Sequence, residues 1–167
     1  DIELYYEVHG HGYPLVFLHG FSSTVSAWEP QVPVLSREYQ FITYDARGHG
    51  QSDSPPREEQ YSADIVAEDL FQILQALGIE KTVVGGHSLG GYRALRFYLR
   101  HPQMVTALII MDTGPGFRNP ARREEWNRQY EEYVRSLETK GVRSRNSVGM
   151  IHTARTVMMQ HDSLVIE

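Results

Sequence analysis

Residues 81–99, KTVVGGHSLGGYRALRFYL, carry the strongest structural signal in this chain. The β-branched run Thr82–Val84 is typical of a buried strand, and the glycines of segment 85–91 favour a sharp turn. Apolar residues after the turn recur at helical spacing. We therefore expect a strand, a tight turn and a helix in succession, with Ser88 at the apex of the turn.

A serine at such an apex suits nucleophilic catalysis. Its hydroxyl is a weak nucleophile, so it must stand clear of the backbone, where a base and a substrate carbonyl can both reach it. Gly86 and Gly90 relieve the crowding that a strained turn imposes. The amide of Leu89, in the first helical turn, is then free to stabilise negative charge on an attacked carbonyl oxygen. Ser88 is thus a candidate nucleophile, and an ordinary serine in a glycine-rich turn is the alternative.

The composition fits one globular domain. The chain has 167 residues, of which 41% are hydrophobic and 22% charged. From these residues we expect neither a membrane span nor a targeting segment, and the sequence has no cysteine for a disulfide, a thiolate zinc site or a thiol nucleophile. The lack of cysteine fits a reducing compartment, so we expect a cytoplasmic protein. A net charge of −5 argues against general nucleic-acid binding, and we expect neither nucleic acid nor membrane as a partner.

Three other apolar runs predict buried strands that end in polar or glycine-containing segments. They are Leu15–Leu18 before His19-Gly20-Phe21, Phe41–Tyr44 before DARGHGQS at 45–52, and Val105–Met111 before Asp112. Helical patterns separate them, and the clearest helix has an N-cap at Ser62 and a stop at Gly78. This alternation predicts the α/β class, with a mostly parallel sheet and helices on both faces. Ligands bind such sheets at the carboxyl ends of the strands, where Ser88 and Phe21 should converge.

Two N-terminal segments have weaker patterns. Residues Ile2–Val8 alternate well enough to predict a strand, and Ala27–Leu35 predicts a helix that Pro30 and Pro33 interrupt. We interpret segment 45–52 as a compact structural turn rather than as a catalytic element.

The C-terminal part carries two amphipathic helical stripes without intervening strands. The first stripe consists of Trp126, Tyr130, Tyr133, Val134 and Leu137, and the second of Met150, Ile151, Ala154, Val157 and Met158. Such helices predict a small cap over the sheet edge, although helices packed on the body of the domain would give the same pattern. We therefore divide the chain into a core at residues 1–114 and a helical cap segment at 115–167.

The residues at three strand ends together resemble the α/β-hydrolase family, in particular its capped serine hydrolases. The matching segments are His19-Gly20-Phe21, the D-x-R-G-H-G-x-S pattern at 45–52, and Gly86-His87-Ser88-Leu89-Gly90. The resemblance implies that Ser88 attacks a substrate carbonyl to form an acyl-enzyme, while the backbone amides of Phe21 and Leu89 form the oxyanion hole. It implies a hydrolase for a small ester, thioester or carbon–carbon-bond substrate that needs no cofactor and no metal.

Other residues have lesser expected roles. His19 and His87 flank the site as structural or pocket-lining residues, because the family's histidine base comes from near the C-terminus. Trp28 and Trp126 are candidates to line an apolar pocket for a small hydrophobic acyl group, and helical spacing explains Trp126 equally well.

The chain departs from the family pattern at its C-terminal end. Family members continue past the cap into two more strands, whose loops carry the acid and the histidine. Here only Leu164–Ile166 is strand-like after Ser163, so we interpret the chain as the N-terminal portion of a hydrolase that lacks its base. Asp112 is a candidate acid, and His152 and His161 are candidate bases with ordinary surface histidines as the alternative. An incomplete sheet would leave an apolar edge open to self-association.

The sequence bears on three other functions. A non-catalytic binding or interaction module on the same scaffold is the main alternative, because the base is missing. An aspartate-nucleophile enzyme, such as an epoxide hydrolase or dehalogenase, is disfavoured because the turn carries Ser88. A nucleotide-binding α/β protein lacks support, because neither G-x-G-x-x-G nor G-x-x-x-x-G-K occurs.

Overall fold

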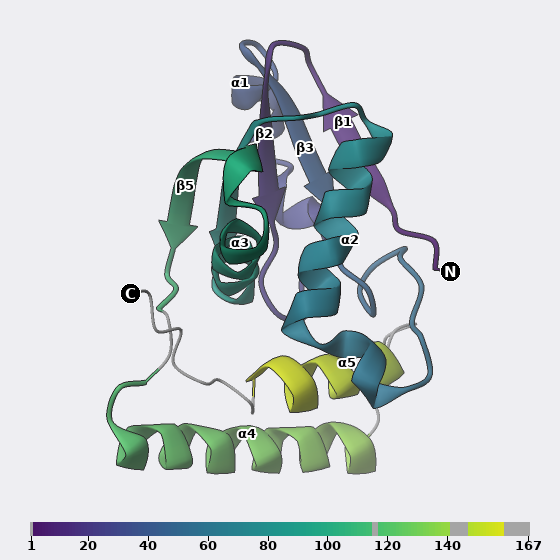
Figure 1. Cartoon of the computed structure of the whole chain (residues 1–167). Helices are drawn as coiled ribbons and strands as arrows, with labels where there is room; N and C mark the ends of the chain where they lie inside the picture. The colour runs from purple at the N-terminus through teal and green to yellow at the C-terminus, as the bar shows by residue number, and fades with distance from the viewer. Residues whose placement is uncertain (1, 115–116, 141–146, 159–167) are drawn as a thin grey trace.

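The structure, a computed structural model, describes residues 2–114, 117–140 and 147–158. Its centre is a five-stranded sheet in the order β1-β3-β2-β4-β5 (Figure 1). The strands are β1 (Tyr6–His9), β2 (Tyr13–Leu18), β3 (Tyr39–Tyr44), β4 (Thr82–His87) and β5 (Val105–Met111). Strand β1 is antiparallel to β3, and the other neighbouring strands are parallel. The expected α/β class with a mostly parallel sheet is confirmed.

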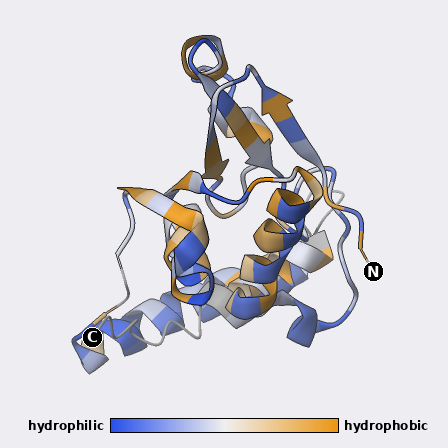
Figure 2. Ribbon diagram, turned by 45° about the horizontal axis from the view of Figure 1, so that its top comes forward, coloured by the Kyte–Doolittle hydropathy of each residue, from blue (hydrophilic) through white to orange (hydrophobic). Residues whose placement is uncertain are grey.

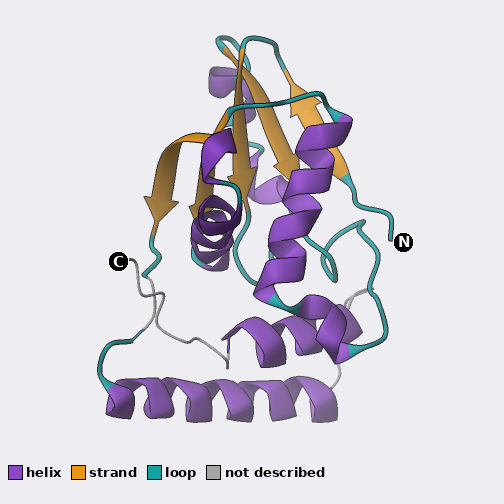
Figure 3. Ribbon diagram, viewed as in Figure 1, coloured by secondary structure: helices purple, strands orange, loops and turns teal. Residues whose placement is uncertain are grey.

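Helices lie over the sheet and beyond the carboxyl ends of its parallel strands (Figure 3). The α-helices are α1 (Val32–Leu35), α2 (Ala63–Ala76), α3 (Leu89–Arg100), α4 (Pro120–Lys140) and α5 (Ser147–Thr153). Shorter elements are the 3-10 helices η1 (Val25–Trp28), η2 (Glu58–Tyr61) and η3 (Pro102–Met104) and the π-helical segment η4 (Ala154–Met158). Within the described ranges, no helix is long and apolar enough to cross a membrane.

Two N-terminal elements differ in extent from their sequence patterns. The strand expected at Ile2–Val8 is β1, which begins only at Tyr6. The helix expected at Ala27–Leu35 is divided into η1 and α1, with Pro30 between them. Proline has no amide hydrogen and its ring clashes with the preceding helical turn, so a continuous helix cannot form. Pro33 lies in the first turn of α1, where the missing amide hydrogen costs little.

The alternation of side chains along the strands gives the sheet two apolar faces. One face packs against α2 and α3, with a cluster that includes Val16, Leu18, Ile42, Tyr44, Val84, Leu70, Leu74, Ala94 and Phe97. The other face packs against η1 and α1, with Leu15, Phe17, Phe41, Trp28, Val32 and Leu35. Figure 2 shows apolar residues concentrated in the strands, whereas α4 is mostly hydrophilic. Burial on both faces fixes the positions of the strand ends.

Helix α2 begins and ends where its sequence signals predict. The Ser62 hydroxyl accepts a 3.3 Å hydrogen bond from the amide of Ile65, as an N-cap does. Gly78 has a φ of +68°, a left-handed conformation that ends the helix at low cost.

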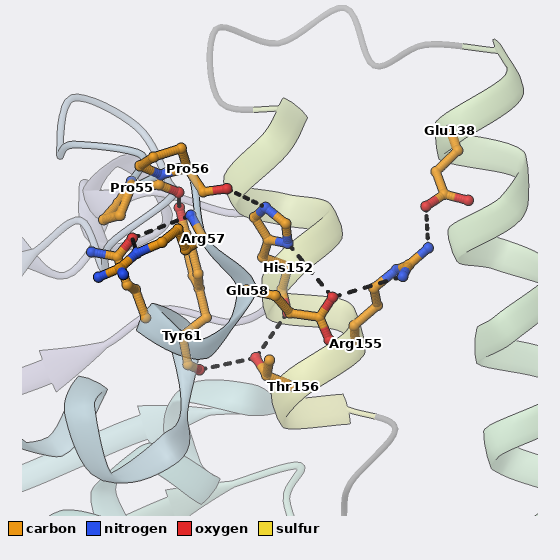
Figure 4. Close-up of polar contacts among 10 residues, drawn as sticks. Pro55, Pro56, Arg57, Glu58, Tyr61, Glu138, His152, Arg155 and Thr156 are labelled. Atoms are coloured by element: carbon orange, nitrogen blue, oxygen red, sulfur yellow. Dashed lines mark hydrogen bonds and ion pairs between the residues drawn. The ribbon is translucent and has the colours of Figure 1, made fainter.

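Helices α4, α5 and η4, here called the helical layer, lie beyond the carboxyl ends of the parallel strands (Figure 1). Polar contacts join this layer to the loop around η2 (Figure 4). The contacts pair His152 with the Pro56 carbonyl, Thr156 with the Tyr61 carbonyl, and Arg155 with Glu58. Within the layer, Arg155 also pairs with Glu138 of α4. The backbones also touch, because a Cβ added to Gly149 would lie 2.3 Å from the Cα of Gly48. The turn at 45–52 therefore supports the helical layer.

Strand β5 forms one edge of the sheet. It pairs with β4, and no strand among the described residues pairs with its other side. Ile109 in this strand is 39% exposed. An edge of this kind presents unpaired backbone groups to any further strand.

Candidate active site

Ser88 lies at the sharp turn that joins β4 to α3. Its φ of 52° and ψ of −121° are rarely adopted by residues with a side chain, and such strain costs on the order of 1–3 kcal/mol. The Ser88 amide donates a 2.9 Å hydrogen bond to the carbonyl of Met111 at the end of β5. Its own carbonyl accepts bonds of 3.0 Å from Gly91 and 3.2 Å from Tyr92. The neighbouring strand and helix thus hold the strained serine in place.

Two glycines permit this turn, for steric reasons. A Cβ added to Gly86 would lie 2.3 Å from the carbonyl carbon of Gly90. A Cβ added to Gly90 would lie 2.0 Å from the carbonyl oxygen of Leu18 at the end of β2. Both approaches involve backbone atoms, which cannot move aside as a flexible side chain can. The G-x-S-x-G spacing therefore matches a point where three backbone segments meet.

The turn after β2 lies directly beside Ser88. A Cβ added to Gly20 would lie 3.5 Å from the Cβ of Ser88, which brings the Gly20-Phe21 segment to the serine. Leu89 is the first residue of α3, so its amide is one of the four that have no acceptor within the helix. The structure thus brings the two candidate oxyanion donors, the amides of Phe21 and Leu89, to the edge that carries Ser88.

His19 is a buried structural contact. Its Nε2 accepts a 3.1 Å hydrogen bond from the amide of Ala46, so its Nδ1 carries the proton and donates to the Gly20 carbonyl at 2.7 Å. Burial is the main cause that lowers the pKa of His19 to about 3, with the Arg93 charge acting in the same direction. The imidazole is therefore neutral at physiological pH. It joins the end of β2 to the turn after β3.

His87 and Asp112 come together at the exposed rim of the turn. Their Nε2 and Oδ2 atoms are 3.5 Å apart, and the two side chains are 51% and 88% exposed. Asp112 has a φ of 48°, so it marks a second strained strand end beside that of Ser88. The parallel register of β4 and β5, which places His87 opposite Met111, explains why the two side chains meet.

Thr113 is a site residue that the sequence did not reveal. Its hydroxyl donates a 2.5 Å hydrogen bond to the Ser88 carbonyl and lies 3.0 Å from the Met111 carbonyl. A Cβ added to Gly91 would lie 2.4 Å from the same hydroxyl oxygen, so Thr113 packs tightly on the first turn of α3. A threonine after a predicted strand carries no sequence signal for such a contact, which depends on the pairing of β4 with β5.

The contacts of segment 45–52 agree with its interpretation as a structural turn. The two carboxylate oxygens of Asp45 each accept a 2.8 Å hydrogen bond, from the amides of Val25 and Gln51. Burial raises the pKa of Asp45, and these two bonds partly offset the effect. Arg47 makes a bidentate pair with Asp69 of α2, at 2.6 Å and 2.5 Å. The charged groups of this turn therefore tie loops and helices together.

Aromatic side chains of α4 pack against the turn that carries Ser88. Trp126 belongs to a cluster with the buried Leu89 and with Phe21. The rings of Phe21 and Tyr133 have centroids 6.2 Å apart. Trp28 instead packs in the core cluster of β2 and β3, on the sheet face opposite α2 and α3. Of the two tryptophans considered as pocket-lining residues, the structure brings Trp126 to the candidate site and Trp28 to the core.

The two candidate bases from the C-terminal part are not brought to Ser88 by any described contact. His152 lies on α5, where its ring contacts that of Tyr61 at a centroid distance of 5.3 Å. His161 lies outside the described residues. Among the residues that the structure describes, no group of three or more histidine or acidic side chains could hold a metal ion.

Comparison with known proteins places this geometry in a family. The sequence model of the alpha/beta hydrolase fold family matches residues 13–155 of this chain. Epoxide hydrolase 3 from Xenopus tropicalis is 39% identical over 98 residues, which cover 59% of this chain and 27% of that protein. The AB hydrolase superfamily protein YisY from Bacillus subtilis is 39% identical over 119 residues, which cover 70% of this chain and 44% of that protein. The matched part of this chain thus spans less than half the length of both relatives.

A solved structure gives the same result in three dimensions. The malate-bound thermophilic esterase from Thermogutta terrifontis superposes with a TM-score of 0.81 at 26% identity, covering 97% of this chain and 69% of that chain. The family match, the sheet order and the strained serine turn all indicate the same fold. This chain belongs to the alpha/beta hydrolase family and is homologous to its hydrolytic enzymes.

Proposed function

We propose that the chain supplies the nucleophile and the oxyanion hole of a serine hydrolase. Ser88 loses its proton to a base and attacks the carbonyl carbon of a small ester, thioester or carbon–carbon-bond substrate. The tetrahedral intermediate then breaks the scissile bond, which leaves the acyl group on Ser88 and releases the alcohol, thiol or carbon leaving group with the proton from the base. The amides of Phe21 and Leu89 donate hydrogen bonds to the oxyanion. Loss of one such donor typically costs about 2.7–4 kcal/mol in the barrier, so the position of both amides matters.

The observation that carries this proposal is the conformation of Ser88. A strained serine, with a φ of 52°, stands between a buried strand and the first amides of a helix. The fold sustains this strain through contacts from β2 and β5, which an ordinary loop serine would not require. The relatives include an epoxide hydrolase, but an aspartate nucleophile is disfavoured because Ser88 occupies the apex.

Neither histidine beside the turn fits the role of base. Both ring nitrogens of His19 are engaged in the interior, and its low pKa disfavours proton uptake. His87 has its Nε2 next to Asp112 at the exposed rim. We therefore propose that the histidine base lies outside the described residues. Asp112 remains a candidate for the acid, because it directly follows β5 and so lies, like Ser88, at the carboxyl ends of the parallel strands.

We further propose that residues 1–114 act as the hydrolase core and 115–167 as a cap segment that shapes the substrate pocket. The aromatic side chains of α4 beside Phe21 support a pocket for a small hydrophobic acyl group. His87 at its exposed rim is a pocket-lining residue in this proposal, whereas the buried His19 is a structural residue.

Covalent labelling tests the proposal directly. A fluorophosphonate probe should add once to the folded chain, on the peptide that contains Ser88, and Ser88→Ala should abolish the adduct. The matched control is Ser22→Ala, because Ser22 also has a positive φ, of 57°, in the neighbouring turn. This variant should retain labelling, which would separate loss of the nucleophile from general damage to the turns at the carboxyl ends of the strands.

The main alternative is a non-catalytic binding module on the same scaffold, and the base missing from the described site favours it. An adduct that persists in Ser88→Ala would refute the assignment of the nucleophile. A folded chain, verified by circular dichroism, that takes up no probe would mean that no base acts on Ser88 within these 167 residues. Labelling of the chain extended by the C-terminal segment that family members carry would then decide, because only a hydrolase should gain the adduct.

A further inference from the structure

The largest fully buried side chain among the described residues is a cation. Arg93, in the second turn of α3, is 1% exposed. Among the residues that the structure describes, none accepts a hydrogen bond from its Nε, Nη1 or Nη2. A guanidinium has five N–H donors and stays protonated in proteins, so a buried one needs acceptors or an opposite charge. The position of Arg93 in the interior therefore requires an explanation.

The nearby carboxylate does not provide one. Arg93 interacts electrostatically with Asp69 and with Arg47, but both oxygens of Asp69 already bind Arg47 in the bidentate pair. Glu68, the next acidic residue on α2, lies 3.4 Å from His101. Two arginines and one aspartate leave the buried cluster with a net charge of +1. An uncompensated charge in a protein interior is strongly unfavourable.

The other groups around Arg93 are neutral. Burial raises the pKa of Tyr44 and lowers the pKa of both His49 and His19, and all three interact electrostatically with Arg93. The hydroxyl of Tyr44 and the Nε2 of His49 are also buried without a hydrogen-bond partner among the described residues. The interior behind the Ser88 turn thus contains several unsatisfied polar groups and a surplus of positive charge.

We propose that Arg93 is the main ligand of a buried inorganic anion site, with the Tyr44 hydroxyl as a second donor. The anion is monovalent because the surplus charge of the cluster is +1. It is small, of the size of chloride, because the site lies in the interior between α2, α3 and β3. A guanidinium forms strong charge-assisted hydrogen bonds to anions. Water could satisfy the N–H groups, but only an anion would also cancel the charge. The bound anion is structural and holds α2 and α3 against the sheet beneath the candidate active site.

Anion-specific stabilisation tests the site independently of any catalytic activity. The thermal midpoint of the 167-residue chain is measured in sodium chloride and in sodium gluconate at equal ionic strength, since gluconate is too large for the interior. A ligand at ten times its Kd should raise the midpoint by about 3–6 °C for a protein of this size. The chloride effect should saturate with concentration, and it should be absent from Arg93→Met.

The matched control is Arg96→Met on the same helix. Arg96 is partly exposed and paired with Asp64, so its loss should lower stability while leaving the chloride-specific shift intact. If Arg93→Met fails to fold, crystals of the parent chain soaked in bromide decide the matter, because bromide is located by its anomalous scattering. A bromide peak at the Arg93 guanidinium supports the proposal. Only water at that position, or an equal midpoint in chloride and gluconate, overturns it.

Discussion

The hydroxyl of Thr113 donates a 2.5 Å hydrogen bond to the carbonyl oxygen of Ser88. Thr113 follows β5, and Ser88 follows the neighbouring strand β4, so the bond joins two strand ends across the sheet. The same two segments are joined by the bond from the Ser88 amide to the Met111 carbonyl. The amide and the carbonyl of the strained serine thus both form hydrogen bonds with Met111 and Thr113 at the end of β5. These bonds explain how its unusual conformation is maintained.

Replacing Thr113 by valine should loosen the Ser88 turn. The change keeps the branched shape but leaves the Ser88 carbonyl without this donor, at a cost of about 0.5–1.5 kcal/mol in the free energy of unfolding. We also expect slower fluorophosphonate labelling of Ser88. Urea unfolding and labelling kinetics measure the two effects. Thr113→Ser, which keeps the hydroxyl, should behave like the parent, and an equal loss in both variants would contradict this role of the hydrogen bond.

Replacing Gly90 by alanine should disrupt the site more severely. The new methyl group would lie 2.0 Å from the Leu18 carbonyl oxygen, so the turn or β2 must move. Overpacking of this kind typically costs about 1–3 kcal/mol, and labelling of Ser88 should be lost. Gly114→Ala is the control, because a Cβ at Gly114 meets no atom of the described residues within 4 Å. Normal labelling in Gly90→Ala would show that the close contact is not required.

Stability should fall below neutral pH because of His19. Its pKa is about 3 in the folded protein against an ordinary value of 6.5, so between these values the unfolded state binds a proton that the folded state does not. The free energy of unfolding should therefore decrease as the pH falls from 6.5, by up to about 1.4 kcal/mol per pH unit. His49, whose pKa is also lowered by burial, acts in the same direction.

Urea unfolding at a series of pH values measures this slope. His19→Gln removes one of these two buried histidines. The slope of the free energy of unfolding against pH, between pH 6 and 4, should therefore be smaller in the variant by about 1.4 kcal/mol per pH unit. The variant will also be less stable overall, but the slope is a separate quantity. An unchanged slope would mean that His19 is not the group that resists protonation.

The outer side of β5, with which no described strand pairs, should allow self-association. We expect sedimentation velocity to show a concentration-dependent shift toward dimers, because an exposed edge can pair with a second strand. Ile109→Lys places a charge on this strand at a position that is 39% exposed, and it should restore the monomer. Val148→Lys on α5 is a control, since that exposed apolar residue lies far from the edge in sequence and on a helix. A parent chain that stays monomeric at high concentration would contradict the prediction.

The sequence alone predicted the strand, turn and helix around Ser88, the class of sheet and the segments that meet at its edge. These features depend on residues close together in the chain: β-branched runs, glycines at fixed spacing and the cap at Ser62. The same local rules correctly predicted the interruption at Pro30, but the interruption that they predicted at Pro33 was wrong, because Pro33 lies in the first turn of α1.

Only the tertiary structure revealed the contacts that support the serine and the charges beneath it. Thr113 reaches Ser88 because β4 and β5 are paired, and His87 meets Asp112 for the same reason. Arg93 lies within a stretch whose sequence pattern is that of an ordinary helix. Its complete burial follows from the packing of α3 on α2 and the sheet. Spacing along a chain determines which residues share a turn or a face, whereas contacts between distant segments depend on how those faces pack.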